Sequence, residues 1–153
     1  MSAVKILIVE DELIIAEDMA MKLENMGYTV LGTAMDYDEA MELLAAETPD
    51  IALLDINLGD NKSGIDVAAH IRKNLNLPIV FITSNTHPDV VAVVATLKPN
   101  GYLVKPYKKE ELFASIEVAL ANYLSSDQQA VKEAFKDTLF INCLLYTSDA
   151  ADD

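Results

Sequence analysis

Side chains that can do chemistry stand directly after four apolar runs of this chain. The carboxylates Glu10 and Asp11 follow the first of these runs, and Asp55, Thr83 and Lys105 each follow a later one. If the runs are strands of an open parallel sheet, their carboxyl ends meet at the edge where such sheets bind ligands. Carboxylate oxygens are preferred ligands of Mg²⁺, and a hydroxyl and an ammonium group can bind phosphoryl oxygens. The pattern therefore predicts a site that holds a divalent cation and receives a phosphoryl group.

The apolar runs alternate with segments of helical period, which indicates an α/β fold. The predicted strands are Val4–Val9, Tyr28–Ala34, Ile51–Leu54, Ile79–Ile82 and Tyr102–Val104. The predicted helices run from Glu12 to near Met26, from Tyr37 to near Glu47, from Gly64 to Asn74, from Pro88 or Asp89 to near Lys98, and from near Lys108 to Tyr123. Helical crossovers between parallel strands cover both faces of a sheet. We therefore expect a five-stranded parallel sheet with five helices.

Local signals support the helix limits. Asp36 is predicted to cap the second helix, with Glu39 three residues on completing a capping box. Gly27 is predicted to end the first helix. The residues expected on the buried face of that first helix are Leu13, Ala16, Ala20 and Leu23.

Composition sets limits on function and location. The chain has 153 residues, of which 52% are hydrophobic and 24% charged, as in ordinary globular proteins. Its net charge of −14 argues against direct binding of nucleic acid by this domain, which would require clustered Lys and Arg. No apolar run reaches the roughly 18 residues that span a bilayer, and the N-terminus has no signal-peptide layout. We expect a cytoplasmic protein that makes no contact with a membrane.

The composition shifts at Ser125, which favours a division into three parts. We expect one domain over residues 1–123, and a linker, helical over Ser125–Lys136, with the start of a missing output domain over residues 124–142. Residues 143–153 lack periodicity and capping signals, and match an in-frame translation of the transposon adapter used to prepare sequencing libraries. They are expected to be an artefact at the end of a truncated reading frame. The only cysteine, Cys143, lies there, so no internal disulfide is expected.

At the predicted strand ends the chain resembles a known family, the receiver domains of bacterial two-component response regulators, also called CheY-like. The resemblance covers roughly residues 2–123. The motifs that carry it are Ile6–Glu12 (ILIVEDE), Leu53–Leu58 (LLDINL), Ile82–Ser84 (ITS) and Gly101–Pro106 (GYLVKP). It implies a flavodoxin-like fold with the sheet order 2-1-3-4-5, in which the first and third strands meet at the ligand-binding edge.

The resemblance also implies a role for each carboxylate. Asp55 would be the phosphoacceptor, which attacks phosphohistidine on a sensor histidine kinase or a phosphotransfer protein. Asp11 would ligate Mg²⁺ directly, with Glu10 helping directly or through water. The backbone carbonyl of Asn57 would complete the protein ligands. Glu10 stands where aspartate is frequent, and Gly59 stands where a proline is common in a slightly shorter loop, which leaves the conformation of that loop open.

Further roles implied by the resemblance belong to the later strand ends. Thr83 and Lys105 would bind phosphoryl oxygens, and Lys105 would also supply positive charge in the transition state. Tyr102 would rotate inward as Thr83 moves toward the phosphoryl group, and the small Ser84 would leave access to the acceptor. The peptide bond before Pro106 is a candidate cis bond.

The sequence gives less detail about the surface and the domain through which the switch would act. The helix Asp89–Leu97 is rich in valine, and either all of these valines pack in the core or a second apolar face meets a partner. We expect the second arrangement, with a switched surface, and a homodimer, formed by this helix, the strand Tyr102–Val104 and the last helix. Residues 132–141 resemble the entry to a LytTR-type DNA-binding domain, although another output domain or a kinase module would also fit.

Three classes of function compete. The first and preferred one is a phosphorylation-dependent switch, which is not itself an enzyme. The second is a receiver-like module that binds proteins without being phosphorylated, but such modules usually lack the acceptor, threonine or lysine that this chain has. The third is a flavodoxin-like cofactor enzyme, which would need a phosphate-binding loop where this chain has Glu10, Asp11 and Glu12.

Overall fold

A computed structural model describes residues 3–58 and 63–134 of the chain, with side chains as far as residue 123. The structure separates a first unit, Met1–Leu120, from the remainder, and the fold described below is that of this first unit. The predictions made for Gly59, for the LytTR-like segment 132–141 beyond residue 134 and for the adapter-like segment lie outside the described residues. Within the described part, no helix has both the length and the apolar composition needed to cross a membrane.

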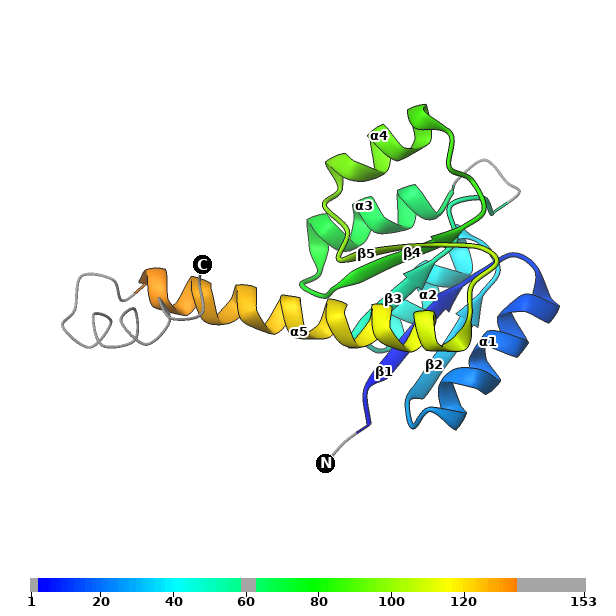
Figure 1. Ribbon diagram of the computed structural model, residues 1–153, viewed down its shortest axis with the longest axis horizontal. Helices are drawn as coiled ribbons and strands as arrows, with labels where there is room; N and C mark the ends of the chain where they lie inside the picture. Colours follow the sequence, from blue (N-terminus) through cyan, green and yellow to red (C-terminus); the bar gives the residue numbers. More distant parts are fainter. Residues whose placement is uncertain (1–2, 59–62, 135–153) are drawn as a thin grey trace. The chain divides into compact units, whose positions relative to one another are not determined.

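Five strands alternate with five helices over the described residues, as predicted (Figure 1). The strands are β1 Lys5–Val9, β2 Thr29–Ala34, β3 Ile51–Leu54, β4 Ile79–Thr83 and β5 Gly101–Val104. The helices are α1 Leu13–Asn25, α2 Tyr37–Ala46, α3 Gly64–Asn74, α4 Pro88–Thr96 and α5 Lys109–Ala134. α5 continues beyond its predicted end at Tyr123 and runs to Ala134. No Gly or Pro interrupts the segment where the composition becomes polar, so the helix does not end there.

The strands form one parallel sheet in the order β2-β1-β3-β4-β5, which confirms the predicted order. Since β1 and β3 are direct neighbours, with Val9 paired to Leu54, the residues after these two strands emerge side by side. The order reverses at β1, and such a switch point is where open α/β sheets bind ligands.

Alternating strand residues fill two cores, one on each face of the sheet. On one face, residues such as Leu54 and Phe81 pack with α2, α3 and α4. On the other, residues such as Ile8 and Ile82 pack with α1 and the first turns of α5. Figure 1 shows the same layers, with α1 and α5 on one side of the sheet. Both faces being covered explains why the central strands are apolar without interruption.

The local predictions hold with two exceptions, the capping box of α2 and the burial of Leu13. The Asp36 side chain accepts a hydrogen bond from the Glu39 amide at 2.8 Å, and Glu39 returns a bond to the amide of Met35 instead of Asp36. Gly27 follows the last turn of α1 with φ of 99°, a conformation that favours glycine. The prediction for Leu13 is wrong: its relative exposure is 50%. It lies in the first turn of α1, whereas the buried residues of this helix are Ala16, Met19 and Leu23.

Candidate functional site

Backbone hydrogen bonds fix the residues that follow the central strands. The Glu10 amide donates to the carbonyl of Ala34 and the Asp55 amide to that of Val9, both at 2.9 Å. Each bond continues the parallel ladder one residue beyond a strand. The two carboxylates are therefore carried by rigid backbone and not by free loops.

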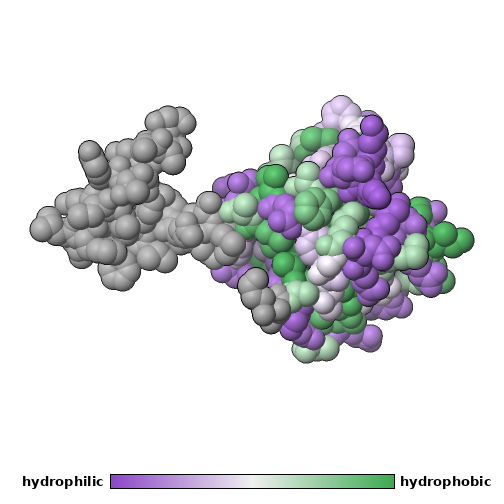
Figure 2. Space-filling model, turned by 60° about the horizontal axis from the view of Figure 1, so that its bottom comes forward, coloured by the Kyte–Doolittle hydropathy of each residue, from purple (hydrophilic) through white to green (hydrophobic). Residues whose placement is uncertain are grey.

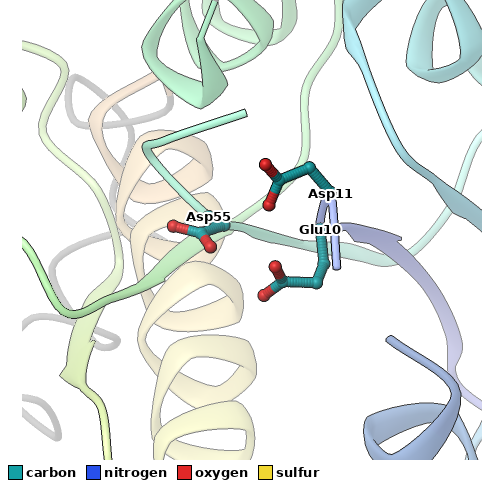
Figure 3. A group of neighbouring side chains, drawn as sticks. All are labelled: Glu10, Asp11 and Asp55. Atoms are coloured by element: carbon teal, nitrogen blue, oxygen red, sulfur yellow. The ribbon is translucent and has the colours of Figure 1, made fainter. Parts of the chain in front are cut away.

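Glu10, Asp11 and Asp55 gather into one acidic cluster. Each offers a carboxylate oxygen, and these oxygens all lie within 4.8 Å of one another. Figure 3 shows the three side chains, two from the end of β1 and one from the end of β3, facing a shared space. Glu10 is 1% exposed and Asp55 7% exposed, so their charges are largely screened from water. A set of hard oxygen donors of this kind fits Mg²⁺.

Lys105 crosses the sheet edge to reach this cluster. Its Nζ donates to Glu10 Oε1 at 2.6 Å and to Asp55 Oδ2 at 3.0 Å. Its backbone is held by a bond from its amide to the carbonyl of Thr83, and the peptide bond to Pro106 is cis. One ammonium group among three carboxylates leaves the site strongly acidic, which suits a divalent cation.

Burial and charge perturb the ionisation of these groups. Burial away from water raises the pKa of Glu10 to about 7, and the nearby charge of Asp55 acts in the same direction against the bond from Lys105. Burial opposes the charged form of Lys105, but its bonds to Glu10 and Asp55 prevail and raise its pKa. The ammonium therefore stays charged at physiological pH and stabilises carboxylates that would otherwise be costly to bury.

The backbone that follows Asp55 is held in a tight turn against the start of α3. The Gly64 amide donates to the carbonyl of Ile56 at 2.9 Å, and the Asn57 amide donates to Asp55 Oδ1 at 3.2 Å. A Cβ placed on Gly64 would lie 1.9 Å from the backbone oxygen of Asp55. Only a glycine fits where α3 begins so close to the end of β3. Sequence reasoning did not single out Gly64, although a glycine at the start of a helix was the available signal.

Thr83 is connected to the loop before α4 and, through it, to β5. Thr83 is fully buried and its Oγ1 accepts a bond from the Asn85 amide at 3.1 Å. The hydroxyl of Tyr102 donates to the carbonyl of Asn85 at 2.7 Å, while Ser84 between them is exposed. Asn85 was missed from the sequence. Its place two residues after a threonine, where a side-chain oxygen can bond a later amide, was the signal.

The comparisons with known proteins agree with this geometry. Residues 6–117 match the response regulator receiver domain family. The chain belongs to this family. The match covers the sheet and all of the residues of the candidate site, so this receiver domain is a member of the two-component response regulators.

Individual relatives support the assignment. The transcriptional regulatory protein PdtaR of Mycobacterium tuberculosis is 34% identical over 119 residues, which cover 78% of this chain and 58% of PdtaR. The chain thus spans little more than half the length of this relative. Among solved structures, the signal receiver domain of a modulated diguanylate cyclase from Desulfovibrio desulfuricans is 36% identical with a TM-score of 0.76, over 82% of this chain and 99% of that one. The chemotaxis protein CheY4 of Vibrio cholerae is 26% identical with a TM-score of 0.68, over 76% and 98%.

Proposed function

We propose that this receiver domain is a phosphorylation-dependent switch in which Asp55 accepts a phosphoryl group from the phosphohistidine of a sensor kinase or a phosphotransfer protein. A carboxylate oxygen of Asp55 attacks the phosphorus, the phosphorus–nitrogen bond breaks, and its electron pair stays on the imidazole nitrogen. The observation that carries the proposal is the burial of Asp55 against two further carboxylates, with the Lys105 ammonium 3.0 Å away.

The acidic cluster would hold Mg²⁺. Glu10, Asp11 and Asp55 supply carboxylate oxygens, and the backbone carbonyl of Asn57 is the fourth proposed ligand. The bound cation supplies positive charge that offsets the repulsion between the acceptor and the incoming phosphoryl oxygens. Asp11, which is less buried than Glu10, is suited to contact the ion directly.

Lys105 and Thr83 would receive the transferred group. Lys105 already donates to Asp55, so its ammonium is placed to bind a phosphoryl oxygen and to stabilise the charge that develops during transfer. The Thr83 hydroxyl would donate to another phosphoryl oxygen. In doing so it would shift the loop that it holds through Asn85, and Tyr102 would follow because its hydroxyl is bonded to the same loop.

The surface that would report this change consists of α4, β5 and α5. The valines of α4 are not all core residues: Val93 is 48% exposed, and Val104 of β5 and Val118 of α5 are 43% and 54% exposed. We propose that this face forms a homodimer, or meets an output partner, when Asp55 is phosphorylated. The space-filling view in Figure 2 shows one face of the molecule, on which apolar surface (green) lies among hydrophilic side chains (purple). Sedimentation velocity of the phosphorylated protein tests the dimer, which Val93→Ser with Val118→Ser should weaken; an unchanged dimer would contradict it.

Transcriptional control is the output that we propose for the full-length protein. A similar protein, PdtaR, is a transcriptional regulatory protein whose length exceeds the matched region. The acidic receiver domain, with a chain net charge of −14, would act on that output through protein contacts and not through nucleic acid.

Intact-mass measurement after incubation with acetyl phosphate tests the switch. We expect the mass of one phosphoryl group, dependent on Mg²⁺ and absent from Asp55→Asn. The matched control is Asp38→Asn, which removes an exposed carboxylate from the first turn of α2 and should leave phosphorylation unchanged. No mass increase in the folded wild-type protein would contradict the proposal and favour a receiver-like module that binds partners without phosphorylation.

A further inference from the structure

Arg72, in the last turn of α3, bonds to the segment just before β4 and to the turn that follows α4, which is distant in the sequence. Its guanidinium donates hydrogen bonds of 2.9 Å to the carbonyl oxygens of Leu77, Leu97 and Lys98 and to the side-chain oxygen of Asn100. A planar guanidinium with five donors can satisfy such a divergent set of acceptors, whereas a single ammonium cannot.

Two of these acceptors belong to the C-terminal end of α4. Leu97 is the C-cap residue of α4, and the carbonyls at a helix end have no partner within the helix. Lys98 follows with φ of 51°, a left-handed conformation that is unfavourable for a residue with a side chain. The cation of Arg72 satisfies these carbonyls at the end of a helix where positive charge is favoured. It thus stabilises a turn that the local sequence does not favour.

The same bonds fasten this turn to the sheet. Asn100 Oδ1 accepts from Arg72 and also from the Ile79 amide, and the Asn100 amide donates to the Ile79 carbonyl at 2.7 Å. Ile79 is fully buried at the start of β4. The C-terminal end of α4 is therefore joined to both α3 and the core of the sheet.

The N-terminal end of α4 is held differently. The loop before it is bonded to Thr83 and to the Tyr102 hydroxyl, both of which belong to the proposed switch. Along the helix itself, all of which the structure describes, Val94 is the one residue that is buried. One end of α4 is thus bonded to the proposed switch and the other to Arg72. Between these ends the helix packs through the buried Val94 and the partly buried Val90, and most of its other residues are exposed.

We propose that Arg72 is a positioning residue that makes the C-terminal end of α4 a fixed pivot. When the Thr83 loop shifts, the N-terminal half of α4 swings while the turn around Lys98 stays in place, so that the exposed valines change direction instead of moving together. This inference rests on the proposed function, because it assumes that phosphorylation moves the loop.

Hydrogen exchange of single amides, followed by NMR, tests the pivot in the full chain with and without acetyl phosphate and Mg²⁺. In the wild type we expect phosphorylation to change exchange between residues 84 and 92, while the amides of Leu97, Lys98 and Asn100 stay within about twofold. In Arg72→Gln these three amides should exchange at least about tenfold faster before phosphorylation and change again after it. Lys73→Gln is the matched control, since it removes an exposed cation from the next position and should behave as the wild type.

The outcomes separate the pivot from a general structural role and from the proposed function. A merely structural role would speed exchange in β1 and β3 as much as near Lys98, and that result would overturn the pivot. The pivot would also be overturned if phosphorylation of the wild type changed amide exchange near Lys98 as much as it changes exchange between residues 84 and 92. Arg72→Lys keeps the positive charge but loses the planar guanidinium with its several donors. Its amide exchange near Lys98 should be faster than in the wild type and slower than in Arg72→Gln. This variant provides the test if Arg72→Gln does not fold. Absence of any added mass in the wild type would overturn the proposed function together with the pivot, whereas normal phosphorylation without local exchange differences would overturn the pivot alone.

Discussion

The two sides of the site differ in how firmly they are packed. The side that carries the proposed acceptor, called the acceptor side here, consists of β1, β3 and β4. It buries every residue of β3 and β4 and all but the first residue of β1. The side of the proposed response, called the response side, consists of α4 and β5; the described residues of β5 are all at least partly exposed, and α4 buries one valine. Regions with few buried contacts open at lower free energy than the core. The arrangement therefore holds the carboxylates of the acidic cluster in a firmly packed region and leaves α4 and β5 easier to move.

Removing apolar volume from each side tests most directly whether the two sides differ in packing. Leu54→Ala deletes a fully buried side chain of β3 and should lower the free energy of unfolding by about 2–5 kcal/mol. Val104→Ala removes a side chain of β5 that is 43% exposed, and should cost about 0.5 kcal/mol or less. Urea denaturation followed by circular dichroism measures both. Equal losses would show that the response side is as tightly packed as the acceptor side.

Two glycines, Gly64 beside the end of β3 and Gly101 in β5, test how far the surrounding structure can yield to an added methyl group. A Cβ on Gly64 would meet the Asp55 carbonyl oxygen at 1.9 Å, a clash that backbone must move to relieve, and Gly64→Ala should destabilise by about 3 kcal/mol. A Cβ on Gly101 would first meet the Val80 side chain at 3.2 Å, which can adjust. Gly101→Ala should therefore cost about 1 kcal/mol or less. The same denaturation series measures both, and a Gly64→Ala protein of wild-type stability would mean that the acceptor strand is not fixed as described.

Much of the fold could be predicted because each strand is short, apolar and followed by a helical period. The sheet order came from resemblance and not from periodicity, which cannot tell which strands pair. The exposure of Leu13 could not be read from helical spacing, because spacing groups residues on one face but does not show which of them meet the core; here Ala16, Met19 and Leu23 do. The boundary expected between the last helix and a helical linker was wrong, and α5 runs through it, because the residues after Tyr123 change in polarity without losing helix propensity.

Only part of the candidate site could be predicted from the sequence. The carboxylates, Thr83 and Lys105 were identifiable because the end of a strand fixes where a side chain emerges. Asn85 and Arg72 were not, because their roles depend on partners supplied by other segments: the Tyr102 hydroxyl that donates to the Asn85 carbonyl, and the Lys98 carbonyl that accepts from the guanidinium. A backbone acceptor leaves no mark on the sequence, so contacts of this kind appear only in the folded structure.

The cation within the acidic cluster provides the third test of the acceptor side. Lys105→Gln removes the ammonium that bonds Glu10 and Asp55, leaving two buried carboxylates without their partner, and should cost about 1–3 kcal/mol in metal-free buffer. Mg²⁺ should then raise the thermal midpoint of the variant more than that of the wild type, since no ammonium competes for the carboxylates. Lys98→Gln, an exposed lysine on the response side, is the control. Equal stabilisation of Lys105→Gln and wild type by Mg²⁺ would contradict the cluster as the metal site.

The smallest expected effect concerns the connection between the two sides. Tyr102→Phe deletes the hydroxyl that donates to the Asn85 carbonyl, and should lower the free energy of unfolding by only about 1 kcal/mol, because one hydrogen bond is exchanged for bonds to water. Its local effect should be larger: amides between residues 84 and 92 should exchange faster, with phosphorylation by acetyl phosphate retained.

Tyr28→Phe separates that local effect from the loss of any tyrosine hydroxyl. The Tyr28 hydroxyl donates to Glu117 on the opposite face of the sheet, so its loss should leave exchange between residues 84 and 92 at the wild-type rate. If both variants change that segment equally, the loop is loose throughout and Tyr102 does not hold it. If only Tyr102→Phe does, the phenol is the link through which the firmly packed acceptor side controls the more weakly packed response side.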